Sequence, residues 1–361
     1  MIKVMITFRE GGENGGPYIS HRRIMESRLK NKYEFIPLYI PKGHLGICNL
    51  NVIKKLRDQI KANKPDIVHF TGLELVGWYG MLACKLANIK NTVMVIRGST
   101  SEAIAFNKNP LKSWVINIIE YITLRNVACA YGVSKYVGTI PRVKKYCRNY
   151  KGHIYNLADF NENTIASTDI RSEFGFNESD IIIVSTGRII KEKGYETLKN
   201  IIILGEWSDN VKFLIVGDGD YLSAMMTEIG ESAMADRVVF AGYRQDIDNI
   251  LCQSDIFIIC TLHETLCNSV IEASYHGLPV VASDVGGIPE IIEHGKSGFL
   301  IDPQDESGFI NAVNLLVTNK NKRNEMGKIG EEIIKTKFAQ DVILDKIDKV
   351  YTSILEDSNN V

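Results

Sequence analysis

Short apolar runs alternate with longer amphipathic stretches along the 361 residues of the chain. Apolar runs of four to eight residues between polar turns are typical of buried strands, and apolar positions three or four apart are typical of helices. Their regular alternation predicts parallel sheets with helices packed against them. The runs form two groups, separated by a polar stretch at 156–164. The pattern therefore predicts two doubly wound α/β domains.

Ten runs are predicted as strands. They span 3–8, 33–40, 66–72, 91–98 and 127–134 in the first group, and 181–188, 211–219, 237–243, 256–262 and 279–284 in the second. We assign an N-terminal domain to 1–160 and a C-terminal domain to 161–338. The pattern of 339–361 predicts a last amphipathic helix, for which packing back on the N-terminal domain is one option. The length also favours two domains, at roughly 150 residues each.

The composition is that of an ordinary globular protein, with 45% hydrophobic and 24% charged residues. No apolar run approaches the roughly 20 residues of a membrane-spanning helix. The opening MIKVMITF is too short for a signal peptide and runs directly into polar residues. Seven scattered cysteines, without a metal-ligand spacing, indicate free thiols in a reducing compartment. These features predict a cytoplasmic protein.

The charge is divided unevenly along the chain. Residues 1–160 hold 25 Lys and Arg against 10 Asp and Glu, and the remainder holds 17 against 33. A basic half suggests an anionic partner such as a lipid surface, a phosphorylated acceptor or nucleic acid. Alternatively, the two halves attract each other across a cleft. We do not expect nucleic acid as a partner, because no recognition motif accompanies the basic residues.

Two segments of the basic half are candidates for contact with the anionic inner face of a membrane. One is the amphipathic stretch NPLKSWVINIIEYITLRN at 109–126, and the other is the basic cluster PRVKKYCRNYK at 141–151. The alternative remains that the apolar stripe is core and that the basic cluster is merely solvated. The sequence does not decide between peripheral membrane contact and these alternatives.

Ligands of doubly wound sheets bind beyond the carboxyl ends of the strands, so polar residues there are candidates. The loop Arg9–Gly16 has four glycines before a helix, which allows close backbone approach to an anion. It lacks the GxGxxG pattern, and a flexible turn is equally consistent with it. Arg188 and Lys193 follow the strand at 181–188 and could together neutralise a diphosphate.

The stretch VGDGDYL at 216–222 allows two interpretations. Asp218 and Asp220 form an Asp-x-Asp pair of the kind that holds Mn²⁺ or Mg²⁺ on a nucleotide sugar. However, Asp-Gly-Asp after a strand is also common turn chemistry. We favour the turn.

The stretch HETLCNSVIEASYHG at 263–277 places a glutamate on either side of a helix start. Asn268 or Ser269 is expected to cap a helix that ends at Gly277. Glu264 then stands before the helix, and Glu272 lies one turn inside it.

The N–H groups of Leu266, Cys267 and Asn268 would point at a ligand, and a phosphate suits such a helix end. The carboxylates of Glu264 and Glu272 would repel a phosphate. We therefore expect them to bind hydroxyl groups on either side of it, the ribose of a nucleotide on one side and a sugar on the other.

The order of these motifs carries a resemblance. The segment between about 180 and 340 contains, in order, Gly-Arg…Lys-Gly, GDG, GYR, SDIFI, ETLCNSVIEA, GLPVVAS, GGIPEII and GKSGFLI. It resembles the donor half of the retaining glycosyltransferases of family 4. The first half is similar more weakly, through GG at 15–16, VHF at 68–70, VSKYV at 133–137 and NLAD at 156–159. The resemblance implies the GT-B fold, in which two Rossmann-like domains face each other across a cleft.

The resemblance also implies roles for individual residues. Arg188 and Lys193 would hold the donor diphosphate, Glu272 the ribose and Glu264 the donor sugar. The backbone at Leu266, Cys267, Asn268 and Ser269 would contact phosphates and sugar, Tyr243 and its neighbours would contact the base, and Gly16 would approach the donor phosphate. The implied activity moves a sugar, with retention, from a UDP-, GDP- or ADP-sugar to a glycan or lipid-linked glycan, in cell-surface polysaccharide synthesis. It implies no metal ion and no cofactor.

Departures from the family pattern concern the acceptor side and the sugar pocket. Arg97 stands where many members carry a histidine; because it cannot act as a base, we expect it to bind an anion or a carbohydrate hydroxyl. His69 is a second acceptor-side candidate, or equally a buried strand residue. Thr265 and Leu266 replace the usual glycine and phenylalanine.

Two alternative classes of protein stay open. One is a non-catalytic paralogue, and the other is a Rossmann-type oxidoreductase, whose dinucleotide fingerprint is incomplete here.

Overall fold

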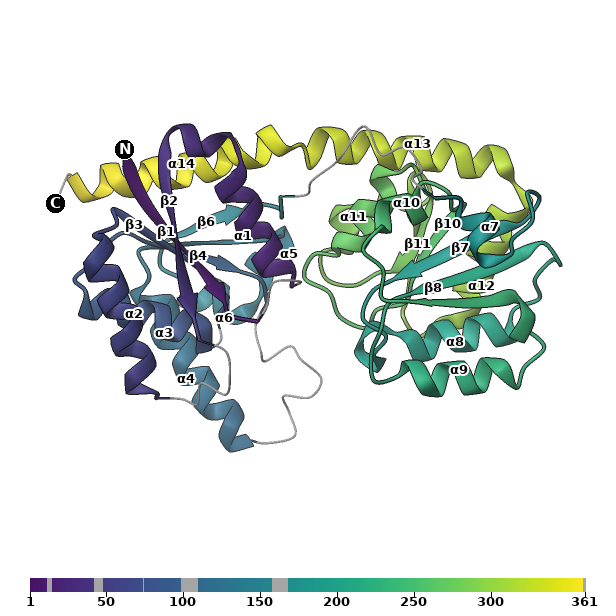
Figure 1. The fold of residues 1–361 in the computed structure, drawn as a ribbon, viewed down its shortest axis with the longest axis horizontal. Helices are drawn as coiled ribbons and strands as arrows, with labels where there is room; N and C mark the ends of the chain where they lie inside the picture. Colours follow the sequence, from purple (N-terminus) through teal and green to yellow (C-terminus); the bar gives the residue numbers. More distant parts are fainter. Residues whose placement is uncertain (12–14, 42–47, 74, 99–109, 158–167, 360–361) are drawn as a thin grey trace. The chain divides into compact units, whose positions relative to one another are not determined.

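Each half of the chain folds into a parallel six-stranded sheet covered by helices (Figure 1). This computed structural model describes all residues except 12–14, 42–47, 74, 99–109, 158–167 and 360–361. The described chain divides into unit 1, residues 1–159 with 340–361, and unit 2, residues 160–339. The predicted GT-B class of fold is confirmed. Parts of the loop Arg9–Gly16, of the polar stretch 156–164 and of the segment 109–126 lie outside the described residues.

The sheet of unit 1 has the order β2-β1-β3-β4-β5-β6. Its strands are β1 (Ile2–Arg9), β2 (Tyr33–Ile40), β3 (Ile67–Thr71), β4 (Thr92–Ile96), β5 (Cys129–Gly132) and β6 (Tyr150–His153). Its helices are α1 (Gly16–Glu26), α2 (Leu50–Asn63), α3 (Leu75–Leu86), α4 (Pro110–Asn126), α5 (Lys135–Thr139), α6 (Pro141–Tyr146) and α14 (Gln340–Asn359), with a 3-10 turn at Arg28–Asn31. The central strands β3 and β4 are almost wholly buried.

The sheet of unit 2 has the order β12-β11-β10-β7-β8-β9. Its strands are β7 (Ile181–Thr186), β8 (Val211–Val216), β9 (Val238–Gly242), β10 (Ile256–Ile259), β11 (Val280–Ser283) and β12 (Gly298–Ile301). Its longer helices are α8 (Tyr195–Leu204), α9 (Leu222–Gly230), α11 (Asn268–Tyr275), α12 (Glu306–Thr318) and α13 (Lys320–Lys337); α7 (Ile170–Phe174) and α10 (Ile247–Leu251) are short. Strand β7 pairs with both β8 and β10, so the strand order reverses beside it.

All ten predicted strands are present. Strand β1 is one residue longer at each end than predicted, β2 matches its prediction, and the other eight are shorter. Strands β6 and β12 were not predicted. Both are four residues long and lie at an edge of their sheets. Strand β6 pairs on one side only and stays partly exposed, so its sequence needs no apolar run. The residues of β6, YKGH, accordingly belong to a stretch that is basic and polar. This reason does not apply to β12, whose sequence GFLI is apolar and was recognised only as part of the GKSGFLI motif.

The C-terminal helix α14 is held on unit 1 by polar contacts. Arg28 pairs with Asp341 at 2.9 Å and with Asp345 at 2.5 Å. Asp348 accepts hydrogen bonds from Lys32 at 2.7 Å and from the Tyr33 hydroxyl at 2.6 Å. Burial acts to raise the pKa of Asp348, but these two hydrogen bonds outweigh it and lower that pKa. Part of the basic charge of the first half is thus balanced within unit 1.

None of the helices in the described part of the chain is long and apolar enough to cross a membrane.

Candidate active site

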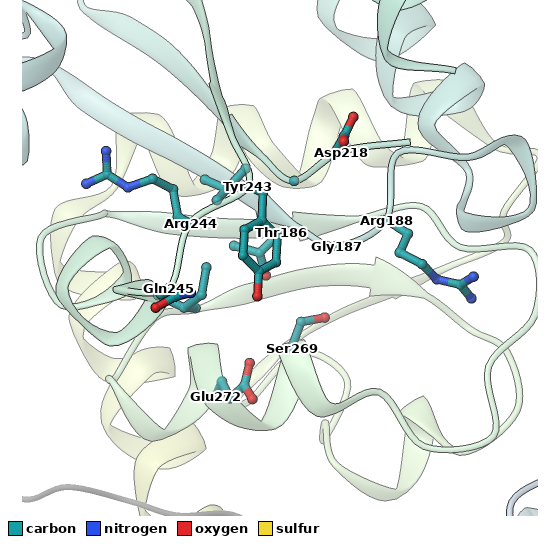
Figure 2. Close-up of a pocket in the computed structure, with 12 residues that line it drawn as sticks. Thr186, Gly187, Arg188, Asp218, Tyr243, Arg244, Gln245, Ser269 and Glu272 are labelled. Atoms are coloured by element: carbon teal, nitrogen blue, oxygen red, sulfur yellow. The ribbon is translucent and has the colours of Figure 1, made fainter. Parts of the chain in front are cut away.

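A pocket of about 470 Å³ opens at the carboxyl edge of the sheet of unit 2, beside the point where the strand order reverses. Loops after β7, β8 and β9 form three of its sides, and α11 forms the fourth (Figure 2). Its lining residues are Thr186, Gly187, Arg188, Val216, Gly217, Asp218, Tyr243, Arg244, Gln245, Ile247, Ser269 and Glu272. Four of these, Arg188, Tyr243, Ser269 and Glu272, were predicted from the sequence.

The turn after β8 is built to pack against the loop after β7. Gly217 has a φ of +142°, and a Cβ there would lie 1.8 Å from the carbonyl oxygen of Gly187. A Cβ on Gly219 would lie 2.3 Å from the carbonyl oxygen of Ile189. The Asp218 carboxylate accepts a hydrogen bond of 2.7 Å from the Gly219 amide. The Gly-Asp-Gly sequence is therefore explained as a close-packed turn, which is the interpretation that we favoured.

Helix α11 presents Ser269 and Glu272 to the pocket, as predicted. Figure 2 shows the Ser269 hydroxyl and the Glu272 carboxylate on one side, with the Tyr243 hydroxyl directed toward them. Gly277, at a φ of +71°, follows the end of the helix. Its amide donates a hydrogen bond to the Ser274 carbonyl, and the Leu278 amide donates one to the Ala273 carbonyl.

The expected cap of α11, Asn268 or Ser269, is wrong by one or two residues. The N-cap is Cys267, and Asn268 is the first helical residue. The Cys267 thiol lies 3.3 Å from the Ser269 hydroxyl, and burial raises its pKa to about 12. The helix starts earlier because Cys267 already has the extended backbone of a cap position.

The loop after β9 supplies Tyr243, whose side chain is 61% exposed, together with Arg244 and Gln245. Arg244 makes two 2.8 Å contacts with Asp246 and also pairs with Glu173. The guanidinium lowers the pKa of Asp246 to about 2. This network fixes the loop that carries Tyr243. Arg244 was predicted only as a neighbour of Tyr243 in the GYR motif, and Gln245 was not predicted, although its place after a strand was a usable signal.

Lys193 and Glu264 form an ion pair beside the start of α11. Their side chains are only 24% and 14% exposed, so the pair is shielded more than a surface ion pair. The sequence assigned these residues to two parts of the donor, the diphosphate and the sugar. The structure brings them into direct contact. Lysine has three N–H donors, so Lys193 can keep Glu264 and still donate to another anion.

Two glycines allow the loops that carry Lys193 and Glu264 to pack closely against neighbouring backbone. Gly194 follows Lys193 at a φ of +72°, and a Cβ there would lie 1.7 Å from the carbonyl oxygen of Cys260. Gly286 has a φ of +58°, and its Cβ would lie 1.6 Å from the carbonyl oxygen of Glu264. The amide of Gly287 donates to that same oxygen at 3.1 Å. Only glycine allows this approach, so the position of Glu264 depends on residues more than twenty positions away in the sequence.

The other predicted donor residues are placed as follows. Arg188 borders the pocket, but Figure 2 shows its guanidinium extending away from the centre, opposite to that of Arg244. Leu266 and Cys267 are buried, at 5% and 3% exposure. Side chains of these two residues therefore pack inward, which leaves only their backbone as a means of contacting a ligand.

Gly16, Arg97 and His69 belong to unit 1. Gly16 is the first residue of α1. Arg97 donates to Thr71 at 3.0 Å and to Asn156 at 2.6 Å, and burial lowers its pKa to about 10, so it stays charged at neutral pH.

His69 is a core residue and not an acceptor-side group. Its side chain is wholly buried, with Nδ1 2.8 Å from the Tyr351 hydroxyl and Nε2 3.1 Å from the Tyr131 hydroxyl. Burial holds its pKa well below the ordinary value. Both ring nitrogens are occupied, so the alternative of a satisfied strand histidine is the one observed.

Two family models match the chain. "Glycosyl transferases group 1" matches residues 166–333, and "Glycosyl transferase 4-like" matches residues 19–131. The two matches fall on both units, so the chain is similar to glycosyltransferases of these two groups over most of its length.

Relatives of known name support the same class. An N-acetyl-alpha-D-glucosaminyl L-malate synthase of Bacillus anthracis is 26% identical over 193 residues, covering 54% of this chain and 51% of the relative. The lipopolysaccharide core biosynthesis glycosyltransferase LpsE of Rhizobium meliloti is 29% identical, over 45% of this chain and 47% of the relative. These matches span about half the length of the two relatives. A UDP-Gal:alpha-D-GlcNAc-diphosphoundecaprenol alpha-1,3-galactosyltransferase of Escherichia coli is 27% identical over 85% of this chain and 82% of the relative.

Solved structures share the fold. HepE of Anabaena, in complex with UDP-glucose, superposes with a TM-score of 0.82 at 18% identity, over 98% of this chain and 100% of that one. Sucrose-phosphate synthase of Thermosynechococcus elongatus superposes with a TM-score of 0.82 at 17% identity, over 99% and 100%.

Proposed function

We propose that this protein is a metal-independent, retaining glycosyltransferase of cell-surface polysaccharide synthesis. It takes a sugar from a nucleoside diphosphate sugar and passes it to a glycan or a lipid-linked glycan. One observation carries the proposal: the pocket at the reversal point of the second sheet gathers Arg188, Tyr243, Ser269 and Glu272, beside the Lys193–Glu264 pair. The free thiols favour a reducing, cytoplasmic compartment.

The pocket suits a nucleoside with its ribose over α11. The Glu272 carboxylate is an acceptor that can take hydrogen bonds from both ribose hydroxyls, and the exposed Tyr243 loop supplies a border for the base. Each of these charge-assisted hydrogen bonds contributes roughly 1.5 to 3 kcal/mol to the binding free energy. The start of α11, Arg188 and Lys193 supply positive potential for the diphosphate.

UDP is the first nucleotide to consider, with GDP and ADP as the others. The Escherichia coli relative is named for a UDP-galactose donor, and HepE was solved with UDP and with UDP-glucose. The same relative is named for a diphosphoundecaprenol-linked acceptor, which favours a lipid-linked glycan here.

The reaction breaks the bond between the anomeric carbon and the diphosphate oxygen, and it forms a bond from that carbon to an acceptor hydroxyl on the same face. The acceptor proton passes to the departing diphosphate, so no side-chain base is needed. Lys193 and Arg188 would stabilise the charge that develops on the diphosphate. Glu264, positioned by Lys193, would hold a sugar hydroxyl. Gly16 and Arg97 keep the roles that the family resemblance predicts, on the donor phosphate and on an acceptor anion.

The test is a thermal-shift series with UDP, GDP, ADP and NAD, each with and without EDTA. A ligand at about 100 times its Kd adds roughly 2.7 kcal/mol to the stability of the folded protein. We expect one nucleoside diphosphate to raise Tm equally in both conditions. A shift that disappears with EDTA would return the Asp218/Asp220 pair to consideration as a metal site. A response to NAD alone would overturn the proposal.

Binding must then be followed by turnover. The stabilising nucleotide identifies the donor series, and each donor is incubated with glycan and lipid-linked glycan acceptors while nucleotide release is measured. Product analysis by NMR gives the anomeric configuration. Nucleotide binding without transfer to any acceptor would favour the non-catalytic paralogue.

A further inference from the structure

Helix α4 carries a line of exposed apolar side chains. Leu111, Trp114, Ile118 and Tyr121 are 72%, 62%, 37% and 40% exposed. Their spacing of three, four and three residues places them on one face of a helix, about 25 Å long for its 17 residues. The opposite face is core, where Ile119 and Leu124 are buried. Both faces of α4 are thus apolar, which an ordinary surface helix does not need.

Basic residues border this apolar line. Tyr121 packs edge-to-face on Tyr146 of α6, with ring centroids 4.9 Å apart, so the line continues onto α6. Arg125 lies over the Tyr121 ring at 5.6 Å, and Lys145 lies over the Tyr146 ring at 5.5 Å. Lys144 and Arg148 are exposed beside them. We call this combined area of α4 and α6 the α4 surface.

The α4 surface has almost no acidic counterpart. Residues 110–151 include eight Lys and Arg but a single carboxylate, Glu120. Glu120 is completely buried and pairs with Arg142 at 2.9 Å, so it offers no negative charge at the surface. The described segment therefore combines an apolar stripe with a positive border.

We propose that the α4 surface docks onto an anionic lipid bilayer. The apolar line would enter the boundary between headgroups and acyl chains, with α4 lying in the plane of the surface. Trp114 and Tyr121 suit that depth because their rings are amphipathic, and the lysine and arginine stems can extend their charges to the headgroups. Charge complementarity selects a lipid surface that is negative. A nucleic acid would match the positive border but would leave Leu111 and Ile118 without an apolar partner.

The test measures binding of the full-length protein to phosphatidylcholine vesicles made with and without a third of phosphatidylglycerol. We expect co-sedimentation with the anionic vesicles, weakened at high salt, and little with the neutral ones. Trp114 is the most exposed tryptophan described, so its emission should shift to the blue on binding, and Trp114→Phe should remove that shift. Equal binding to neutral vesicles, or no binding to either, would overturn the proposal.

Matched variants distinguish vesicle binding by the α4 surface from nonspecific binding through charged or apolar residues elsewhere on the protein. Each lysine contributes about fivefold to binding near an anionic surface, so Lys144→Glu with Lys145→Glu should weaken it by about 25-fold or more. The same reversals at Lys320 and Lys328, exposed on α13, should have little effect. Trp114→Ser should weaken binding by about tenfold or more, whereas Leu204→Ser, at a site 64% exposed on α8, should not.

The proposal goes beyond the proposed function, because vesicle binding needs neither donor nor turnover. The variants should keep the Tm shift with the nucleotide, which shows that they fold. If Trp114→Ser abolishes self-association in sedimentation while vesicles never bind, the α4 surface is an interface between two copies of the chain and the lipid proposal is wrong.

Discussion

Both units are parallel six-stranded sheets, but their strand orders differ and they place their polar groups in different ways. Unit 2 keeps polar side chains accessible at the carboxyl edge of its sheet, where Glu272 and Tyr243 line a pocket. Unit 1 holds a histidine and tyrosine cluster in its interior, where α14 supplies Tyr351 as a hydrogen-bond partner of His69. Figure 1 shows α14 along the sheet of unit 1. The same class of parallel sheet thus has an accessible polar edge in unit 2 and a paired, buried polar cluster in unit 1.

The largest effect is expected from the glycine that positions Glu264. Gly286→Ala would force a Cβ into the Glu264 carbonyl, which must move, so kcat/KM should fall by about a thousandfold or more. Gly295→Ala is the matched control: it also has a positive φ, of +77°, but open space around its Cβ. We expect the control to cost only about 1 to 2 kcal/mol of stability and little activity. Similar losses from both changes would show that backbone strain, not the collision, is what matters.

Lys193→Ala comes next. It leaves the Glu264 carboxylate partly buried and unpaired, and it removes a charge from the diphosphate, so kcat/KM should fall by about 100-fold. Lys191→Ala serves as control, since Lys191 lies in the same 3-10 turn and contacts exposed Glu196 and the Tyr221 ring, not Glu264. A Glu264→Gln background should reduce the penalty of Lys193→Ala. Additive losses would argue against a working pair.

Glu272→Gln should weaken nucleotide binding by roughly 10- to 100-fold, as expected for the loss of charge-assisted hydrogen bonds. Calorimetric titration of the nucleoside diphosphate measures this directly. Glu178→Gln, on an exposed turn of the same unit, should leave the Kd unchanged. Affinity that survives Glu272→Gln would remove the ribose assignment.

Acid should affect unit 1 more than unit 2. Burial lowers the pKa of His21 to about 3, against 6.5 when unfolded, so the unfolded chain binds the extra proton first. Stability is therefore complete above pH 6.5 and falls as the pH decreases toward 3, by about 2 kcal/mol at pH 5 for this group. His69, 4.9 Å away ring to ring, acts in the same direction.

Hydrogen exchange at pH 7.5 and pH 5 would locate the acid effect. The core strands of unit 1 should lose protection before those of unit 2. His69→Gln removes one titrating group and should reduce the pH dependence. An equal loss of protection in both units would mean that these two histidines are not the cause.

The sequence predicts most of the fold because the central strands are uniformly apolar. It fails at β6, whose YKGH needs no apolar pattern at a sheet edge. In the site, residues of a local motif, such as Ser269 and Glu272 on α11, could be predicted together. The pairing of Lys193 with Glu264 could not, because it depends on Gly194 and Gly286 bringing distant loops into contact. The hydrogen bonding of His69 could not be predicted either, because it depends on Tyr351, which is distant in the sequence.

The return of the chain to unit 1 has a consequence for its synthesis. Unit 1 begins at residue 1 but lacks Tyr351, Asp348 and the rest of α14 until the ribosome has made all of unit 2. Until then Arg28 and Lys32 have no aspartate partners from α14, and His69 lacks one of its two hydrogen bonds. The first half to be made is therefore the last to be completed, and a nascent chain that stops before residue 340 would have a finished unit 2 beside an unfinished unit 1.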